Sequence, residues 1–143
     1  MTTHASDEYL SSAVLTASSE QLQLMLYDGA IRFARQAREA ILKGDWETSC
    51  DKLIRAQRVV TEMQNGLRPE ANPGVCEQMS ALYNFVFRRL VDANVQHQVG
   101  PLDEALQILE HQRETWKILL DRIGTLEAPE EGSQLLEPLS LHG

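Results

Sequence analysis

The stretch "SEQLQLMLYDGAIRF", residues 19–33, has the pattern of a capped helix with more apolar side chains than one face can hold. Ser18 is a suitable N-cap and Gln21 follows three positions later, a spacing typical of a capping box. At about 100° per residue the apolar residues fall on two nearly opposite stripes. The first stripe is Leu22, Met25, Leu26, Gly29 and Phe33, and the second is Leu24, Tyr27, Ile31 and Ala34. A surface helix needs one such stripe, so something else is expected to cover the other.

Three further helical patterns follow this helix, and no stretch has the alternation of a strand. The expected helices are residues 19–43, 45–67, 73–98 and 101–123. Gly44 suits a helix end, Asp45 and Asn72 suit N-caps, and Gly100–Pro101 is expected to separate the last two helices. Short connections make sequence neighbours antiparallel neighbours in space. The sequence therefore predicts an all-α fold, a single antiparallel up-down-up-down four-helix bundle.

Polar segments are expected on either side of the bundle. Residues 1–17 are predicted to be a flexible N-terminal segment, residues 18–126 the four-helix bundle, and residues 127–143 a disordered tail. The tail, "EAPEEGSQLLEPLSLHG", contains two prolines and two glycines and has no helical period. Its four leucines are apolar enough to dock transiently on the bundle.

Charge and composition exclude several classes of function. The 143 residues include 13 basic and 21 acidic ones, giving a net charge of −8. Such a chain repels the phosphate backbone of nucleic acid and an anionic membrane surface. No apolar run is long enough to span a bilayer, and the N-terminus has no secretion signal. Cys50 and Cys76 do not form a C-x-x-C pair, so reduced, buried thiols and a cytoplasmic location are expected.

The sequence carries no motif of catalysis or metal binding. There is no phosphate-binding loop, nucleophile elbow or dinucleotide turn, and none of the four histidines follows a glutamate by three positions, as a di-iron helical bundle requires. We therefore expect no enzyme activity and no cofactor. Gln57 and Arg113 interrupt the predicted core stripes. Gln57 is interpreted as a hydrogen-bonded register device, a buried-stripe amide that fixes how the helices align. Arg113 is interpreted as a residue whose guanidinium reaches solvent at the edge of the core while its aliphatic part packs against the core.

The third helix repeats the apolar surplus of the first. Its predicted core stripe is Val75, Met79, Leu82, Val86 and Leu90, and its flank carries Phe87, Val91 and Val95 at i, i+4 and i+8. One interpretation is contact with adjacent helices, since each helix in a bundle touches two others. The other is a groove that an amphipathic or disordered partner fills as it folds.

The residues resemble those of the flagellar secretion chaperones of the FliS type. The similarity lies in "VLTASSEQLQLMLYDGAIRFARQAREAI" (14–41), "LIRAQRVVTEMQNGL" (53–67), "LYNFVFRRLVDANVQ" (82–96) and Trp116 in "RETWKIL". These segments follow the family's order and spacing from about Tyr9 to Leu120. Two departures are Ser19, where the family usually has proline, and a longer tail.

The resemblance implies a cytoplasmic chaperone that binds the C-terminal segment of flagellin, which is disordered when free. It further implies that the complex prevents premature polymerisation and delivers flagellin to the flagellar type III export gate. In the family the N-terminal segment can cap the same surface, and the matching residues here are Tyr9, Val14 and Leu15. We expect the grooves to be lined by Leu24, Tyr27, Ile31, Phe87, Val91 and Val95, with Asp28 as the polar neighbour of the Tyr27 hydroxyl.

A second class of protein fits the helical pattern alone. The same apolar faces would serve a homodimer or a regulatory interaction protein, in which the flanks pair with another copy of the chain. A molecular mass that rises with concentration, and falls to that of a monomer when a client peptide is added, would show that both partners share the surface.

Overall fold

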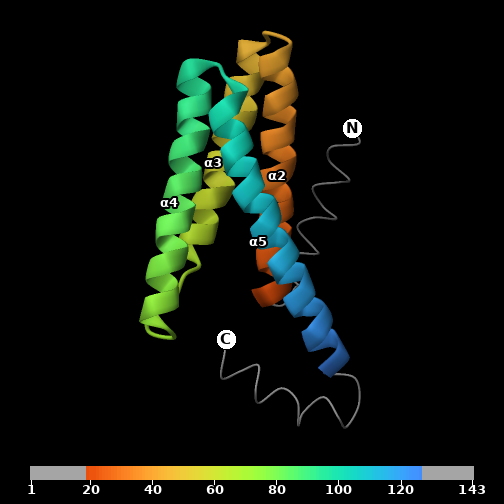
Figure 1. Ribbon diagram of the computed structural model, residues 1–143, viewed down its shortest axis with the longest axis vertical. Coiled ribbons are helices and arrows are strands. Elements are labelled where there is room, and N and C mark those ends of the chain that lie inside the picture. The colour runs from red at the N-terminus through yellow and green to blue at the C-terminus, as the bar shows by residue number, and fades with distance from the viewer. Residues whose placement is uncertain (1–18, 127–143) are drawn as a thin grey trace. The chain divides into compact units, whose positions relative to one another are not determined.

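The fold is taken from a computed structural model that describes residues 19–126, with side chains as far as residue 122. Four helices make up this part of the chain: α2 (Ser19–Leu42), α3 (Trp46–Asn65), α4 (Pro73–Gln96) and α5 (Val99–Leu126) (Figure 1). No strand occurs within residues 19–126. The predicted all-α, antiparallel four-helix bundle is confirmed, whereas the predictions for residues 1–17 and 127–143 lie outside the described residues.

The turn between α2 and α3 forms as the sequence predicts. Gly44 adopts a left-handed φ of 72°, which glycine reaches without a steric cost. The Gly44 N–H donates to the Ile41 carbonyl (3.0 Å) and the Asp45 N–H donates to the Ala40 carbonyl (2.9 Å), the paired bonds of a Schellman ending. The Asp45 Oδ1 then accepts the Thr48 N–H at 3.1 Å and caps α3. The chain therefore reverses within three residues.

The boundary between α4 and α5 differs from the prediction. Asn72 caps α4 as expected, its Oδ1 accepting the Val75 N–H at 3.2 Å. At the other end, however, His97 with a φ of 53° terminates α4, and α5 already begins at Val99. Pro101 thus lies inside the first turn of α5 and does not separate two helices. A proline is tolerated there, because the N–H groups of a first turn have no partner within the helix.

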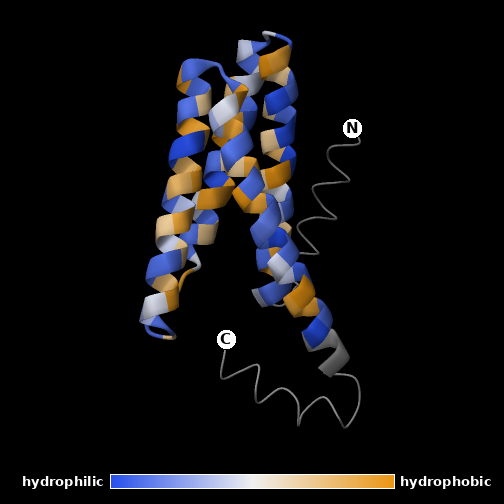
Figure 2. Ribbon diagram, viewed as in Figure 1, coloured by the Kyte–Doolittle hydropathy of each residue, from blue (hydrophilic) through white to orange (hydrophobic). Residues whose placement is uncertain are grey.

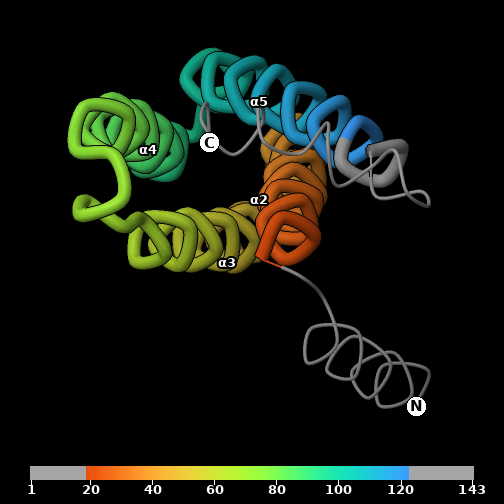
Figure 3. The backbone as a smooth tube through the Cα atoms, turned by 90° about the horizontal axis from the view of Figure 1, so that it is seen from below, coloured from red at the N-terminus to blue at the C-terminus, as the bar shows by residue number. Residues whose placement is uncertain are grey.

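The chain divides into two compact units, which we describe separately. The larger is Met25–Arg113, and the smaller combines the two chain ends, Met1–Leu24 and Glu114–Gly143. In the larger unit α3 lies between α2 and α4, as the view along the helices shows (Figure 3), and α3 and α4 pack side by side. Of the smaller unit, the structure describes the first turns of α2 and the end of α5, where Leu22, Leu24, Trp116, Leu119 and Leu120 are half-buried.

The core of the larger unit draws on all four helices. Alanines dominate the contribution of α2, which lets its neighbours approach closely. The buried apolar residues are Tyr27, Ala30, Ile31, Ala34, Ala37, Ala40, Ile41, Leu53, Ala56, Val60, Met63, Tyr83, Val86, Leu90, Ala93, Leu102, Ala105, Leu106 and Leu109. Ser49 is buried as well, and its Oγ donates to the Trp46 carbonyl at 3.0 Å. Burial of this many apolar side chains is the main stabilising contribution to the bundle.

Candidate functional site

The structure reverses the two apolar stripes of α2. Tyr27 and Ile31, from the stripe expected to face a partner, are only 0% and 5% exposed. Leu26 and Phe33, from the opposite stripe, are half-buried. The stripe with Tyr27 also carries the small residues of α2, and its alanines allow close helix contact. Tyr27 and Ile31 are therefore core residues, and their direct contact with a partner stays a prediction that no exposed surface supports.

The hydroxyl of Tyr27 has a different partner from the one expected. It lies 2.8 Å from the Tyr83 hydroxyl, so a buried hydrogen bond joins α2 to α4, and either oxygen can be the donor. The expected partner, Asp28, instead accepts a hydrogen bond from the Nε of Arg113. Arg113 is therefore held by an ion pair between α2 and α5, rather than only reaching the rim as predicted.

The first half of α4 is more exposed than its sequence pattern predicts. Apolar residues recur along the whole helix (Figure 2), but Val75 is 49% exposed and Met79 and Leu82 are only half-buried. Phe85, a large aromatic residue, is 44% exposed. The predicted core stripe is correct for Val86 and Leu90 and wrong for the residues before them. An apolar surplus therefore exists, and it extends beyond the flank that the sequence singles out.

That flank, made of Phe87, Val91 and Val95, grows more exposed toward the C-terminal end of α4. Phe87 and Val91 are half-buried, and Val95 is 74% exposed. Leu24, predicted to share their groove, is half-buried in the first turns of α2 and belongs to the smaller unit. Of the six predicted groove residues, the structure places Phe87 in a pocket.

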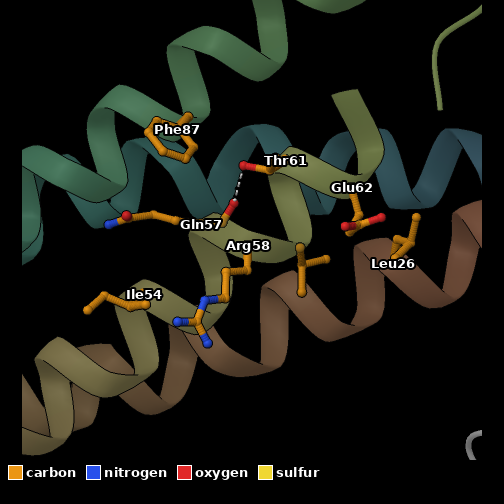
Figure 4. A pocket seen from close by; sticks show the side chains of 8 residues that line it. Leu26, Ile54, Gln57, Arg58, Thr61, Glu62 and Phe87 are labelled. Carbon is orange, nitrogen blue, oxygen red and sulfur yellow. Dashed lines mark hydrogen bonds between the residues drawn. The ribbon is translucent and has the colours of Figure 1, made fainter. Parts of the chain in front are cut away.

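The pocket lies over the outer face of α3 (Figure 4). It has a volume of about 500 Å³, and α2 and α4 each contribute one residue, Leu26 and Phe87. The remaining lining residues belong to α3: Ile54, Gln57, Arg58, Val59, Thr61 and Glu62. Gln57, interpreted above as a hydrogen-bonded register device, is a half-buried pocket residue, and its backbone carbonyl accepts a hydrogen bond from the Thr61 hydroxyl at 3.0 Å.

The chemistry of the pocket suits an amphipathic chain. Leu26, Ile54 and Phe87 supply apolar surface from three helices, and Arg58 and Glu62 place opposite charges at its rim. An amphipathic helix binds such a surface with its apolar residues inside and its polar residues at the edge. The sequence did signal one of the missed residues, since Leu26 is on the first stripe of α2. Ile54 is an apolar residue of the predicted second helix, but the sequence gives it no role in a site.

Ion pairs join α2 to α5 elsewhere in the described helices. Arg35 pairs with Glu110 at 2.7 Å and Arg38 with Asp103 at 2.7 Å, both joining α2 to α5. The hydrogen bond and charge of Asp103 raise the pKa of Arg38, and the cap hydrogen bond from Thr48 lowers the pKa of Asp45. Within residues 19–126, no group of three or more His, Cys, Asp or Glu side chains is arranged to hold a metal ion. None of the described helices is long and apolar enough to cross a membrane.

The described helices thus form a bundle with a pocket on α3 whose lining includes apolar residues from three helices. Comparison with known sequences shows that the chain belongs to the FliS family, since the family described as "Flagellar protein FliS" matches residues 1–122. The flagellar secretion chaperone FliS of Bacillus subtilis is 36% identical over 109 residues, covering 76% of this chain and 80% of the relative. The FliS chaperones of Salmonella typhimurium and Escherichia coli are 32% and 28% identical, each covering 74% of this chain and 79% of the relative. Membership of a chaperone family fits a site built for binding.

Proposed function

We propose that this protein is a cytoplasmic export chaperone that binds the disordered C-terminal segment of flagellin, prevents its premature polymerisation and assists its flagellar type III secretion. Membership of the FliS family supports this proposal, as does the similarity to relatives named flagellar secretion chaperones. A segment that is buried in an assembled filament is apolar on one face while it is free. It therefore needs a partner with apolar grooves and no catalytic groups.

The observation that carries the proposal is the pocket over α3. Its apolar residues come from three helices, and Ile54, one of them, is 38% exposed. A helix of the client laid along α3 would present apolar residues to Leu26, Ile54 and Phe87. Val91 and Val95 on α4 are proposed to extend this surface, and Tyr27 and Ile31 to support it from within the core. Leu24, in the smaller unit, remains a predicted contact residue of its own.

We further propose that the N-terminal segment acts as a cap over part of this surface. Tyr9, Val14 and Leu15 are the residues of the cap, and flagellin would displace them when it binds. The complex would then engage the flagellar export gate.

A calorimetric titration tests the proposal. The ligand is a peptide of the C-terminal segment from the flagellin of the same organism. We expect one-to-one binding with a Kd on the order of 1 μM or tighter, a negative heat-capacity change and a gain of helical ellipticity, since the client folds as its apolar face is buried. Absence of heat at several temperatures would contradict the proposal and would direct attention to self-association.

A matched pair of substitutions locates the site. Ile54→Glu places a charge on the lining of the pocket, whereas Leu42→Glu makes the same kind of change at an exposed position (62%) at the end of α2. We expect Ile54→Glu to weaken peptide binding about tenfold or more, because it replaces an apolar contact of the proposed interface with a charge that binding would bury. Leu42→Glu should change the Kd less than about threefold, and neither variant should lose helical ellipticity. Equal losses in the two variants would remove the pocket from the proposal.

A further inference from the structure

A cluster of positive charge surrounds an aromatic side chain where α2 meets α3. The Arg32 Cζ lies 5.1 Å from the centre of the Phe33 ring, and the Lys52 Nζ and Arg55 Cζ each lie 5.9 Å from it. Arg58 follows one turn after Arg55 and lines the pocket. We call Arg32, Phe33, Lys52, Arg55 and Arg58 the basic face.

The charge of the basic face is only partly neutralised. Arg55 pairs with Asp51 at 3.1 Å, and both side chains are about half exposed, at 52% and 53%. Among residues 19–126, Arg32, Lys52 and Arg58 form no ion pair with a carboxylate. Arg35 and Arg38, on the same helix as Arg32, do pair with acids of α5. The basic face is thus a surface of excess positive charge with a half-buried aromatic ring, in a chain whose net charge is −8.

The chain ends carry acidic residues and no lysine or arginine. All 13 basic residues lie within residues 19–126, whereas six of the 21 acidic residues lie outside this range. Four of those six are in the C-terminal segment, residues 127–143, which contains no lysine or arginine. The same segment carries four leucines close to its acids. Its charged and apolar residues are Glu127, Glu130, Glu131, Leu135, Leu136, Glu137, Leu139 and Leu141.

We propose that the C-terminal segment 127–143 docks on the basic face of the same chain. Its carboxylates lie against Arg32, Lys52 and Arg58, and its leucines cover the Phe33 ring and the adjoining edge of the pocket. Opposite charges attract the segment and set its position, and the leucines remove exposed apolar surface from water. An acidic, leucine-bearing chain meets both properties of the basic face at once.

The chain is long enough for this contact, whatever direction the end of α5 takes. Arg113, the last α5 residue of the larger unit, pairs with Asp28, which precedes Phe33 by five residues, or about 8 Å along α2. The helical residues 114–126 span about 20 Å. Residues 127–143 reach up to about 58 Å when extended, so the segment can return along α5 and still cover the basic face.

The docking is expected to be weak and reversible. Exposed ion pairs contribute little individually and are screened by salt. Because the segment belongs to the same chain, however, its effective concentration at the basic face is on the order of 1 mM, which populates even a weak contact.

Paramagnetic relaxation in the full-length chain tests the contact. A nitroxide is attached at Ser140→Cys in a protein whose Cys50 and Cys76 are replaced by serine. At low salt we expect the label to broaden the amide signals of residues 32–33 and 52–58 at least twofold more than those elsewhere in α2 and α3. The broadening should disappear at about 0.5 M salt, where the Debye length falls to a few ångströms.

Two variants serve as test and control. Glu127→Gln, Glu130→Gln, Glu131→Gln and Glu137→Gln together keep the length and leucines of the segment, and they should abolish the selective broadening. Asp7→Asn with Glu8→Gln removes acids from the other chain end and should leave it unchanged. Broadening that is uniform, that centres on Val75 and Phe85, or that survives the four Gln substitutions would overturn the proposal.

A mixing experiment identifies the chain that supplies the segment. Protein that carries the nitroxide but no ¹⁵N is mixed with ¹⁵N protein that carries no nitroxide. Selective broadening in this mixture would show that the segment docks on a second copy of the chain, and it would overturn the proposal. No flagellin enters either measurement, so a failure here leaves the proposed export function untouched.

Discussion

At the residue scale, the most specific contact is the hydrogen bond between Tyr27 and Tyr83. Both side chains are at most 1% exposed, and their rings are tilted by 58° with centres 6.4 Å apart. The bond therefore joins α2 and α4 inside the core, where a polar group is stable only when it is hydrogen-bonded. The sequence indicates that Tyr27 needs a polar partner, but it offers Asp28 next in the chain, whereas the partner lies on another helix.

A double-mutant cycle on the two tyrosines measures this bond. Tyr27→Phe and Tyr83→Phe each remove one hydroxyl, and each should lower the free energy of unfolding by about 1 kcal/mol. The double variant should cost less than the sum of the single variants, by about 0.5–1 kcal/mol, because the second substitution removes a hydroxyl that has already lost this partner. Urea unfolding followed by ellipticity gives the three values. Strict additivity would show that the hydroxyls do not interact in solution.

At the element scale, the helix ends are the best-predicted features of this chain. Gly44, Asp45 and Asn72 take the roles that their types suggest, because caps depend on a few neighbouring residues. The helix α5 begins at Val99, two residues before the predicted start at Pro101. A proline in the first turn of a helix and a proline in a linker cannot be distinguished from the sequence. The left-handed residue that ends α4 is His97, which carries no signal as strong as a glycine.

The cap at Asp45 predicts a pH dependence. Its pKa is lowered in the folded state by the hydrogen bond from Thr48, so the ionised carboxylate stabilises the fold. This contribution is fully present above the unfolded pKa of about 3.9 and is lost as the pH falls through the lower folded value. Asp45→Asn keeps an acceptor but does not titrate. The Tm advantage of the wild type over this variant should therefore be constant from about pH 7 to 5 and shrink below about pH 4.

Glu70→Gln controls for the loss of one exposed carboxylate, here in the loop between α3 and α4. The Tm difference between the wild type and Glu70→Gln should not shrink below about pH 4 in the way expected for Asp45→Asn. A gap for Asp45→Asn that stays constant down to pH 3 would mean that the cap does not depend on ionisation.

At the scale of the whole molecule, the reversed stripes of α2 change what substitutions are expected to do. Ile31→Asp would bury an unpaired carboxylate in the core, and it should cost at least about 3 kcal/mol or abolish helical ellipticity. Leu26→Asp lies at the half-buried pocket and should cost about 1 kcal/mol while weakening client binding. Thermal and urea unfolding of the two variants distinguish the faces. Equal stability losses would mean that α2 does not present these faces as described.

The number and type of the helices, most of their ends, their antiparallel order and the surplus of apolar surface can all be predicted from the amino-acid sequence. These features follow from periodicity and capping, which act within a few residues. The folded chain is needed to show which stripe of α2 lies in the core, which part of α4 is exposed, and that Leu26, Ile54 and Phe87 line one pocket. Periodicity gives the angle between two apolar stripes, but it does not say which of them faces the neighbouring helices. That choice depends on how side chains from distant parts of the chain fill the shared interior.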